Sequence, residues 1–136
     1  MKRIRDGPSP ILENPKATAL CFADLAEKDR EVFCLGCLDV RNQLIARHTV
    51  FIGTTDTTLA HPREILRTAL VAMATRIVVV HNHPSGVTSP SREDLEVTTK
   101  LAAACEIVGI ELLDHVIIGR YGQYWSWVDA GKPEHL

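Results

Sequence analysis

A run of β-branched residues in the middle of the chain, Arg76–Val80, constrains the fold more than any other segment. Uninterrupted apolar runs of this kind are typical of a central strand that other elements cover on both faces. Helical patterns flank the run at residues 61–75 and 91–108. Pro62 suits the first turn of one helix, and Gly109 suits the end of the other. The run therefore predicts a sheet with helices packed against it.

The rest of the chain adds one helical pattern and four strand patterns. Residues 31–38 and 44–51 predict a β-hairpin with a polar turn between its strands. In chain order the expected elements are α-β-β-α-β-α-β-β, which predicts an α/β domain with a mixed β-sheet packed between helices. The other expected elements are a helix at residues 16–28, a loop at 53–58, and strands at 110–118 and 123–128 joined by a turn at 119–122.

Residues 1–15 contain one glycine and three prolines and lack a periodic apolar pattern. We predict an N-terminal arm over residues 1–15 and one domain over residues 16–136, because 136 residues can bury a core without disulfides. No apolar segment has the length of a signal-peptide core or a membrane span. We therefore expect a cytoplasmic protein with no membrane partner and with reduced cysteines. The oligomeric state stays open.

The segment most informative about function is HNHPSGVTSPSREDL, residues 81–95. His81 and His83 are two apart at the end of the predicted central strand, so their side chains project to the same side. Open α/β sheets bind ligands at the ends of such strands. A sharp turn follows, and Asp94 lies in the first turn of the next helix. Two imidazoles and a carboxylate suit a zinc ion with its fourth position open for a water, whose pKa zinc lowers to about 7.

Simpler interpretations apply to each part of this segment alone. Ser91 and Asp94 have the spacing of a capping box, in which both side chains bind free N–H groups at a helix start. A His-x-His pair alone is more often a pair of polar loop residues. The conjunction of histidines at a strand end, a compact turn and an acid favours a metal site.

The same residues carry a resemblance to a known family. His81-x-His83, seven further residues, Ser91, two residues and Asp94 resemble the JAMM (MPN-plus) metalloprotease motif. HNHPSG, PSREDL, HPREI and LLDHVIIG together resemble the RadC-like branch of that superfamily. This resemblance implies a JAB/MPN architecture, similar to that of cytidine deaminases. It also implies a catalytic domain alone, because longer members carry an N-terminal helix-hairpin-helix region.

The resemblance implies a role for each motif residue. His81, His83 and Asp94 correspond to the Zn²⁺ ligands, and Ser91 to a serine that helps to stabilise the tetrahedral intermediate. The family's general acid/base corresponds to Glu31, for which the sequence alone predicts a solvent-exposed charge at a strand start. Amide cleavage needs such a group, because the departing nitrogen must be protonated.

The leading hypothesis is a zinc-dependent hydrolase of the JAMM type that cleaves an amide or isopeptide bond in a peptide or protein substrate. A second hypothesis is a role in acting on or binding DNA, because the resemblance includes the family's traditional label of DNA repair protein. The net charge of −2 gives this hypothesis little support. A non-catalytic zinc-binding module is a further alternative. Zinc deamination is rejected, because that chemistry expects His-x-Glu and residue 83 is histidine.

Three further residues have weaker claims to chemistry. Glu64 competes for the role of general base, but its place at a helix start favours an interaction with the helix dipole. Cys34 and Cys37 are three apart on a predicted strand, so they face opposite sides and cannot share one metal ion without a turn. We expect both cysteines to pack as small hydrophobes.

Two residue pairs near the C-terminus also need an interpretation. Asp114 and His115 have two interpretations of equal weight, support for a ligand histidine or a structural pair at a strand end. Trp125 and Trp127 are expected on one face of the last strand, where they pack in the core or form an edge contact.

Overall fold

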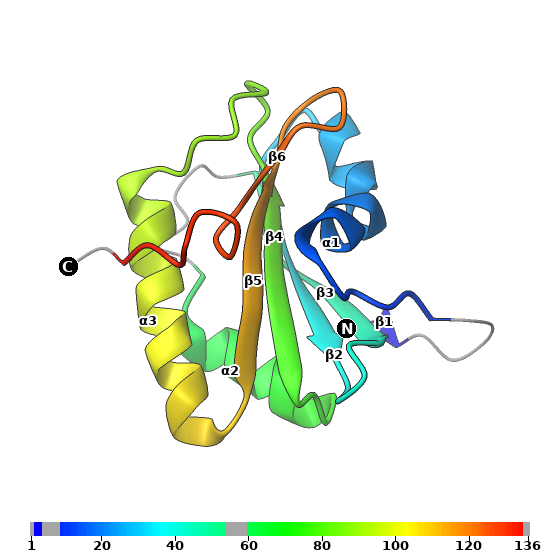
Figure 1. Ribbon diagram of the computed structural model, residues 1–136, viewed down its shortest axis with the longest axis vertical. Helices are drawn as coiled ribbons and strands as arrows, with labels where there is room; N and C mark the ends of the chain where they lie inside the picture. Colours follow the sequence, from blue (N-terminus) through cyan, green and yellow to red (C-terminus); the bar gives the residue numbers. More distant parts are fainter. Residues whose placement is uncertain (1, 4–8, 54–59, 135–136) are drawn as a thin grey trace.

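A six-stranded mixed sheet forms the centre of the protein, with strand order β1-β3-β2-β4-β5-β6 (Figure 1). The structure is a computed structural model that describes residues 2–3, 9–53 and 60–134. Strands β4 and β5 are parallel, and every other neighbouring pair is antiparallel. The strands are β1 (Lys2–Arg3), β2 (Val32–Leu38), β3 (Leu44–Ile52), β4 (Arg76–Asn82), β5 (Glu111–Ile118) and β6 (Tyr124–Ser126).

Helices cover both faces of this sheet. Helix α1 (Pro15–Cys21) and the 3₁₀ helix η1 (Ala23–Glu27) lie on one face, and α2 (Pro62–Val71) and α3 (Arg92–Val108) lie on the other (Figure 1). Each face has its own cluster of buried apolar side chains. The predicted α/β class, with a mixed sheet packed between helices, is therefore confirmed.

Strand β4 is the buried central strand that the sequence predicts. Its apolar residues are fully buried and alternate between the two core clusters. The strand continues to Asn82 rather than ending at residue 80, because parallel pairing with β5 continues to the pair Asn82–Ile118. His81 thus belongs to the strand, and His83 is the first residue beyond it.

Two expected helices are shorter than predicted. The helix expected over residues 16–28 is divided at Phe22, a fully buried residue with φ −107° and ψ 19°. Helix α2 ends at Val71 rather than near residue 75. There Met73 adopts φ 61° and the N–H of Ala74 binds the carbonyl of Ala69, which satisfies the helix end and reverses the chain. Glycine, the usual sign of such an end, is absent at this position.

Part of the predicted arm contacts the domain. Backbone atoms of β1 pair with β3, and Leu12 is buried. The division at residue 16 stays a prediction. The expected loop at 53–58 lies outside the described residues except for Gly53.

The predicted packing of two side-chain pairs is observed. Cys34 and Cys37 are buried in the clusters on opposite faces of the sheet. Trp125 and Trp127 both pack against the cluster beneath α2 and α3.

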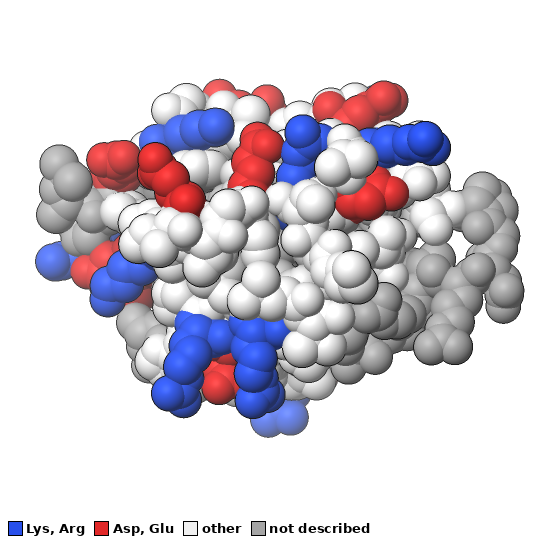
Figure 2. Space-filling model, turned by 90° about the horizontal axis from the view of Figure 1, so that it is seen from below, with Lys and Arg blue, Asp and Glu red and all other residues white. Residues whose placement is uncertain are grey.

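The surface on the side opposite to the carboxyl ends of β4 and β5 carries charges of both signs. Figure 2 shows uncharged side chains in the centre of this surface, with Lys and Arg interspersed with Asp and Glu around them. Among the described helices, none is long and apolar enough to cross a membrane.

Candidate metal centre

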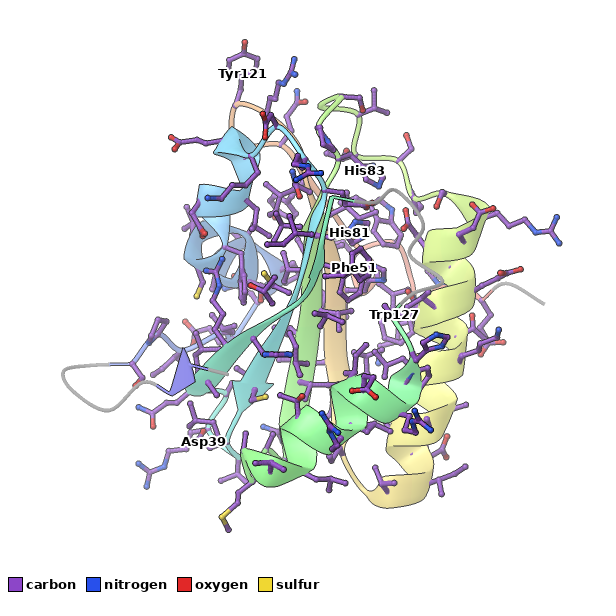
Figure 3. All side chains as sticks on the ribbon, turned by 180° about the vertical axis from the view of Figure 1, so that it is seen from behind. Asp39, Phe51, His81, His83, Tyr121 and Trp127 are labelled. Carbon is purple, nitrogen blue, oxygen red and sulfur yellow. The ribbon has the colours of Figure 1, made fainter. Side chains whose placement is uncertain are left out.

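Four side chains from three separate segments meet where β4 ends. His81 lies near the end of strand β4, and His83 directly follows that strand (Figure 3). Glu31 immediately precedes β2, and Asp94 lies in the first turn of α3. Each offers one ligand atom, and these atoms lie within 4.8 Å of one another. The structure therefore brings together the three predicted zinc ligands and the predicted general base.

The carboxylate of Asp94 lies between the two imidazoles. Its Oδ1 is 3.4 Å from His81 Nε2, and its Oδ2 is 3.2 Å from His83 Nε2. His81 and Asp94 are almost completely buried, whereas His83 is partly exposed. One side chain of the cluster is thus partly exposed to solvent while the others are enclosed.

The remaining nitrogen of each histidine already has a partner. His81 Nδ1 lies 2.8 Å from Glu31 Oε1, and His83 Nδ1 lies 2.8 Å from the carbonyl oxygen of Val87. The carbonyl can only accept, and an ionised carboxylate also accepts, so in both rings Nδ1 is assigned as the N–H donor. The lone pair of Nε2 is then available on His81, and on His83 when that ring is neutral, which is the arrangement that metal-binding histidines show.

Several buried polar atoms have no hydrogen-bond partner among the described residues. They are Glu31 Oε2, His81 Nε2, Asp94 Oδ1 and His115 Nε2. An unpaired buried polar atom costs about 1–3 kcal/mol, so such atoms usually mark a water, an ion or a catalytic role. Three of the four belong to the cluster. Imidazole nitrogens with a carboxylate oxygen form a donor set that suits Zn²⁺, so the residues present fit this ion.

The electrostatics of Asp94 and His83 are coupled. Burial alone would raise the pKa of Asp94, but the hydrogen bond with His83 and the nearby His81 outweigh it and hold this pKa well below its usual range. The hydrogen bond with Asp94 raises the pKa of His83, against the effect of its burial. Without a metal ion, the pair therefore has the character of an ion pair.

Ser91 and Asp94 form the capping box that the sequence offered as the simpler interpretation. The N–H of Asp94 donates to Ser91 Oγ at 3.0 Å, and the N–H of Ser91 donates to Asp94 Oδ2 at 2.8 Å. The cap uses Oδ2 and leaves Oδ1 free. The cap and the cluster are therefore compatible, and the cap fixes the carboxylate relative to the helix.

Among the predicted site residues, Glu31 differs most in burial from what the sequence alone predicts. The sequence alone predicts an exposed side chain, whereas Glu31 is 4% exposed. The competing Glu64 lies on α2, where it is half exposed and forms ion pairs with Arg63 and Arg67. It is outside the cluster. Asn82, between the two histidines, binds the backbone on both sides of Glu31.

Asp114 and His115 have different partners and different roles in the structure. Asp114 accepts hydrogen bonds from Ser126 and from backbone N–H groups, and has a structural role between β5 and β6. His115 lies on the other side, with its ring centroid 5.0 Å from that of His81 and its Nδ1 bonded to Thr98. Neither side chain forms a hydrogen bond with a histidine of the cluster among the described residues. His115 therefore supports His81 only by packing.

The cluster opens into a cleft with a volume of about 520 Å³. Glu31, His83, Ser91 and Asp94 all contribute to its walls. The volume falls in the range of pockets that bind small molecules and cofactors. The residues lining the rest of the cleft are Asp29, Arg30, Gly53, Pro84 and Ser85.

Comparisons with a family model and with individual proteins point to the same family. Residues 11–132 match the family described as RadC-like JAB domain. A UPF0758 protein of Picosynechococcus sp. is 50% identical over 111 residues, which cover 81% of this chain and 46% of that protein. A UPF0758 protein of Thermotoga maritima is 45% identical over 125 residues, covering 92% of this chain and 55% of that protein. The chain thus spans about half the length of the curated relatives it matches.

Proposed function

This chain belongs to the RadC-like JAB domain family, and we propose that it is a zinc-dependent hydrolase that cleaves an amide or isopeptide bond in a peptide or protein. One observation carries the proposal: the buried group of Glu31, His81, His83 and Asp94, in which three polar atoms have no hydrogen-bond partner among the described residues. A structural role alone gives no reason to bury unpaired atoms at the wall of a cleft.

Three of these side chains would hold the ion. The ligand atoms are Nε2 of His81, Nε2 of His83 and Oδ1 of Asp94, because the other polar atoms of these side chains already have partners. Three protein ligands leave a coordination position open, which is typical of catalytic rather than structural zinc sites. Zinc at this position would act as a Lewis acid and lower the pKa of a water to about 7.

We assign proton transfer at this open coordination position to Glu31. Its Oε1 accepts from His81 Nδ1, while its Oε2 is free among the described residues. Oε2 would take a proton from the attacking water and pass it to the departing nitrogen. Proton transfer by a positioned side chain contributes about 10²–10⁴-fold to a rate.

We assign a supporting role toward the substrate to Ser91. Its hydroxyl oxygen accepts from the N–H of Asp94, so the hydroxyl proton is left to donate. Ser91 lines the same cleft as Glu31. We assign this proton to the substrate carbonyl oxygen, where negative charge develops during attack.

The test uses zinc-loaded protein and two substrates, a peptide and an isopeptide. The variant Glu31→Gln keeps the shape of the side chain and removes its basicity, so hydrolysis should fall about 10²–10⁴-fold while zinc remains bound. Glu64→Gln, an exposed glutamate outside the cluster, is the matched control and should leave the rate unchanged. Zinc-loaded wild type without hydrolysis on any amide substrate, or a Glu31→Gln variant as active as wild type, would overturn the proposal.

A further inference from the structure

Asn82 separates the two histidines in sequence, and its side chain is 2% exposed. Side chains alternate along a strand, so it points to the opposite face from His81. We propose that Asn82 is a positioning residue that fixes the carboxylate of Glu31 beside His81. This inference rests on the proposed role of Glu31 as general acid/base.

The amide of Asn82 binds the backbone before and after Glu31. Its Oδ1 accepts from the N–H of Val32 at 2.7 Å, and its Nδ2 donates to the carbonyl of Arg30 at 2.9 Å. A longer contact of 3.4 Å joins Nδ2 to the carbonyl of Lys28. Both the acceptor and the donor side of the amide are therefore used, and all partners lie in the segment that carries Glu31.

The hydrogen bonds of Asn82 with residues 28–32, which we call the clamp, take the place of strand pairing beyond the point where β2 and β4 stop pairing. The last residue pair between β2 and β4 is Phe33–His81. Beyond it, residues 28–31 form no regular secondary structure, so only specific contacts determine where Glu31 lies. One contact comes from the residue that follows β3, Gly53, whose N–H donates to the carbonyl of Glu31 at 2.8 Å. Asn82 provides the contacts on the other side.

The clamp links the position of Glu31 to the positions of His81 and His83. Asn82 is bonded covalently to His81 and His83, so a displacement of this part of β4 also moves the segment that carries Glu31. The distance of 2.8 Å between Glu31 Oε1 and His81 Nδ1 is thereby set by adjacent residues of one strand. A misplacement of about 1 Å in a catalytic group can cost about 10²-fold in rate, which makes such a clamp functionally important.

The first arm of the test needs no activity. In metal-free protein with ¹⁵N-labelled histidine, the His81 Nδ1–H that donates to Glu31 should give a slowly exchanging, downfield proton signal. Asn82→Ala should lose or broaden this signal while the protein stays folded. Ser126→Ala, which removes a similarly buried hydrogen bond between β6 and β5, is the matched control and should keep it. If Asn82→Ala does not fold, Asn82→Asp keeps the oxygen that binds Val32 and removes the donor to Arg30.

The second arm is a double-mutant cycle on hydrolysis by zinc-loaded protein. Asn82→Ala should lower kcat at least about tenfold, with KM and zinc affinity within about threefold, because the metal ligands lie on the other face of the strand. In the Glu31→Gln background the same change should have almost no further effect, since the group that Asn82 positions is already inactive. A purely structural role would lower kcat equally in both backgrounds.

Each arm can contradict the inference separately. An unchanged His81 signal in folded Asn82→Ala protein overturns the positioning role, as does an equal loss of kcat in both backgrounds. If the wild type shows no hydrolysis, the proposed function fails. The proton signal still decides whether Asn82 positions Glu31.

Discussion

His81 Nε2 and Asp94 Oδ1 face each other at 3.4 Å, yet neither atom forms a hydrogen bond with any described residue. Because His81 Nδ1 donates to Glu31, Nε2 carries a lone pair, and the facing carboxylate oxygen is also an acceptor. Two buried acceptors repel each other unless a cation or a proton lies between them. The pair therefore defines where a metal ion would stabilise the folded protein.

The first prediction is that zinc raises the melting temperature of the chelator-treated protein. An ion that binds only the folded state adds about 2.7 kcal/mol of stability at a free concentration one hundred times its Kd. For a protein of this size, that corresponds to an increase of several degrees. Differential scanning calorimetry at increasing free zinc measures it. An unchanged melting temperature, with no zinc retained in the folded protein, would contradict a metal site.

The second prediction concerns the ligand Asp94. Asp94→Asn keeps a capping oxygen for the N–H of Ser91 but removes the charge between the two histidines. Zinc affinity should fall by more than about 100-fold, since changes of residues that only support a ligand already cost about 10–100-fold. Competition with a chromophoric chelator gives the affinity. Asp129→Asn, an exposed aspartate near the C-terminus, serves as the control, and equal affinities for both variants would exclude Asp94 as a ligand.

Sequence periodicity is sufficient to predict the fold class because β4 is apolar on both faces and helical patterns flank it in the sequence. The proximity of His81, His83 and Asp94 could also be predicted, since these residues lie within fourteen residues of one another. The burial of Glu31 could not be predicted from the residue itself, because its neighbours in the fold, such as Asn82, lie about fifty positions away in sequence. The early end of α2 was also missed, because Met73 rather than glycine adopts the left-handed conformation there.

The third prediction separates the two roles of Ser91. Ser91→Ala removes the N-cap of α3 and should cost about 1 kcal/mol in the free energy of unfolding. Ser91→Gly should cost only a few tenths of a kcal/mol, since glycine is tolerated at this position. Both variants lack the hydroxyl, so both should lose hydrolytic rate. Urea denaturation and initial rates measure the two effects, and a rate that follows stability alone would contradict a role for the hydroxyl in catalysis.

The fourth prediction concerns the loop that carries His83. A Cβ atom on Gly119 would lie 2.5 Å from Thr88 Cγ2 and 2.8 Å from the carbonyl oxygen of Gly86. Gly119→Ala should therefore displace this loop, lowering zinc affinity and the free energy of unfolding together. Gly122→Ala is the matched control for zinc affinity: it lies in the same turn, has open space around it, and should leave the affinity unchanged even though its φ of 76° makes alanine strained. An affinity unaffected in Gly119→Ala would show that the loop can move without disturbing His83.

The last prediction is a pH dependence that originates in His115. Burial, reinforced by the neighbouring His81, lowers the pKa of His115 to about 3. In the unfolded chain a histidine titrates near about 6.5, so between these values the unfolded state binds more protons than the folded state. The free energy of unfolding of metal-free protein should consequently fall as the pH is lowered from about 6.5 towards 3. His115→Gln, which does not titrate, should flatten this decline by up to about 1.4 kcal/mol per pH unit. His48→Gln, a change at a partly exposed histidine of β3, should leave most of the slope intact. Urea denaturation curves at successive pH values measure the slope, and equal slopes for His115→Gln and wild type would show that His115 does not cause the acid sensitivity.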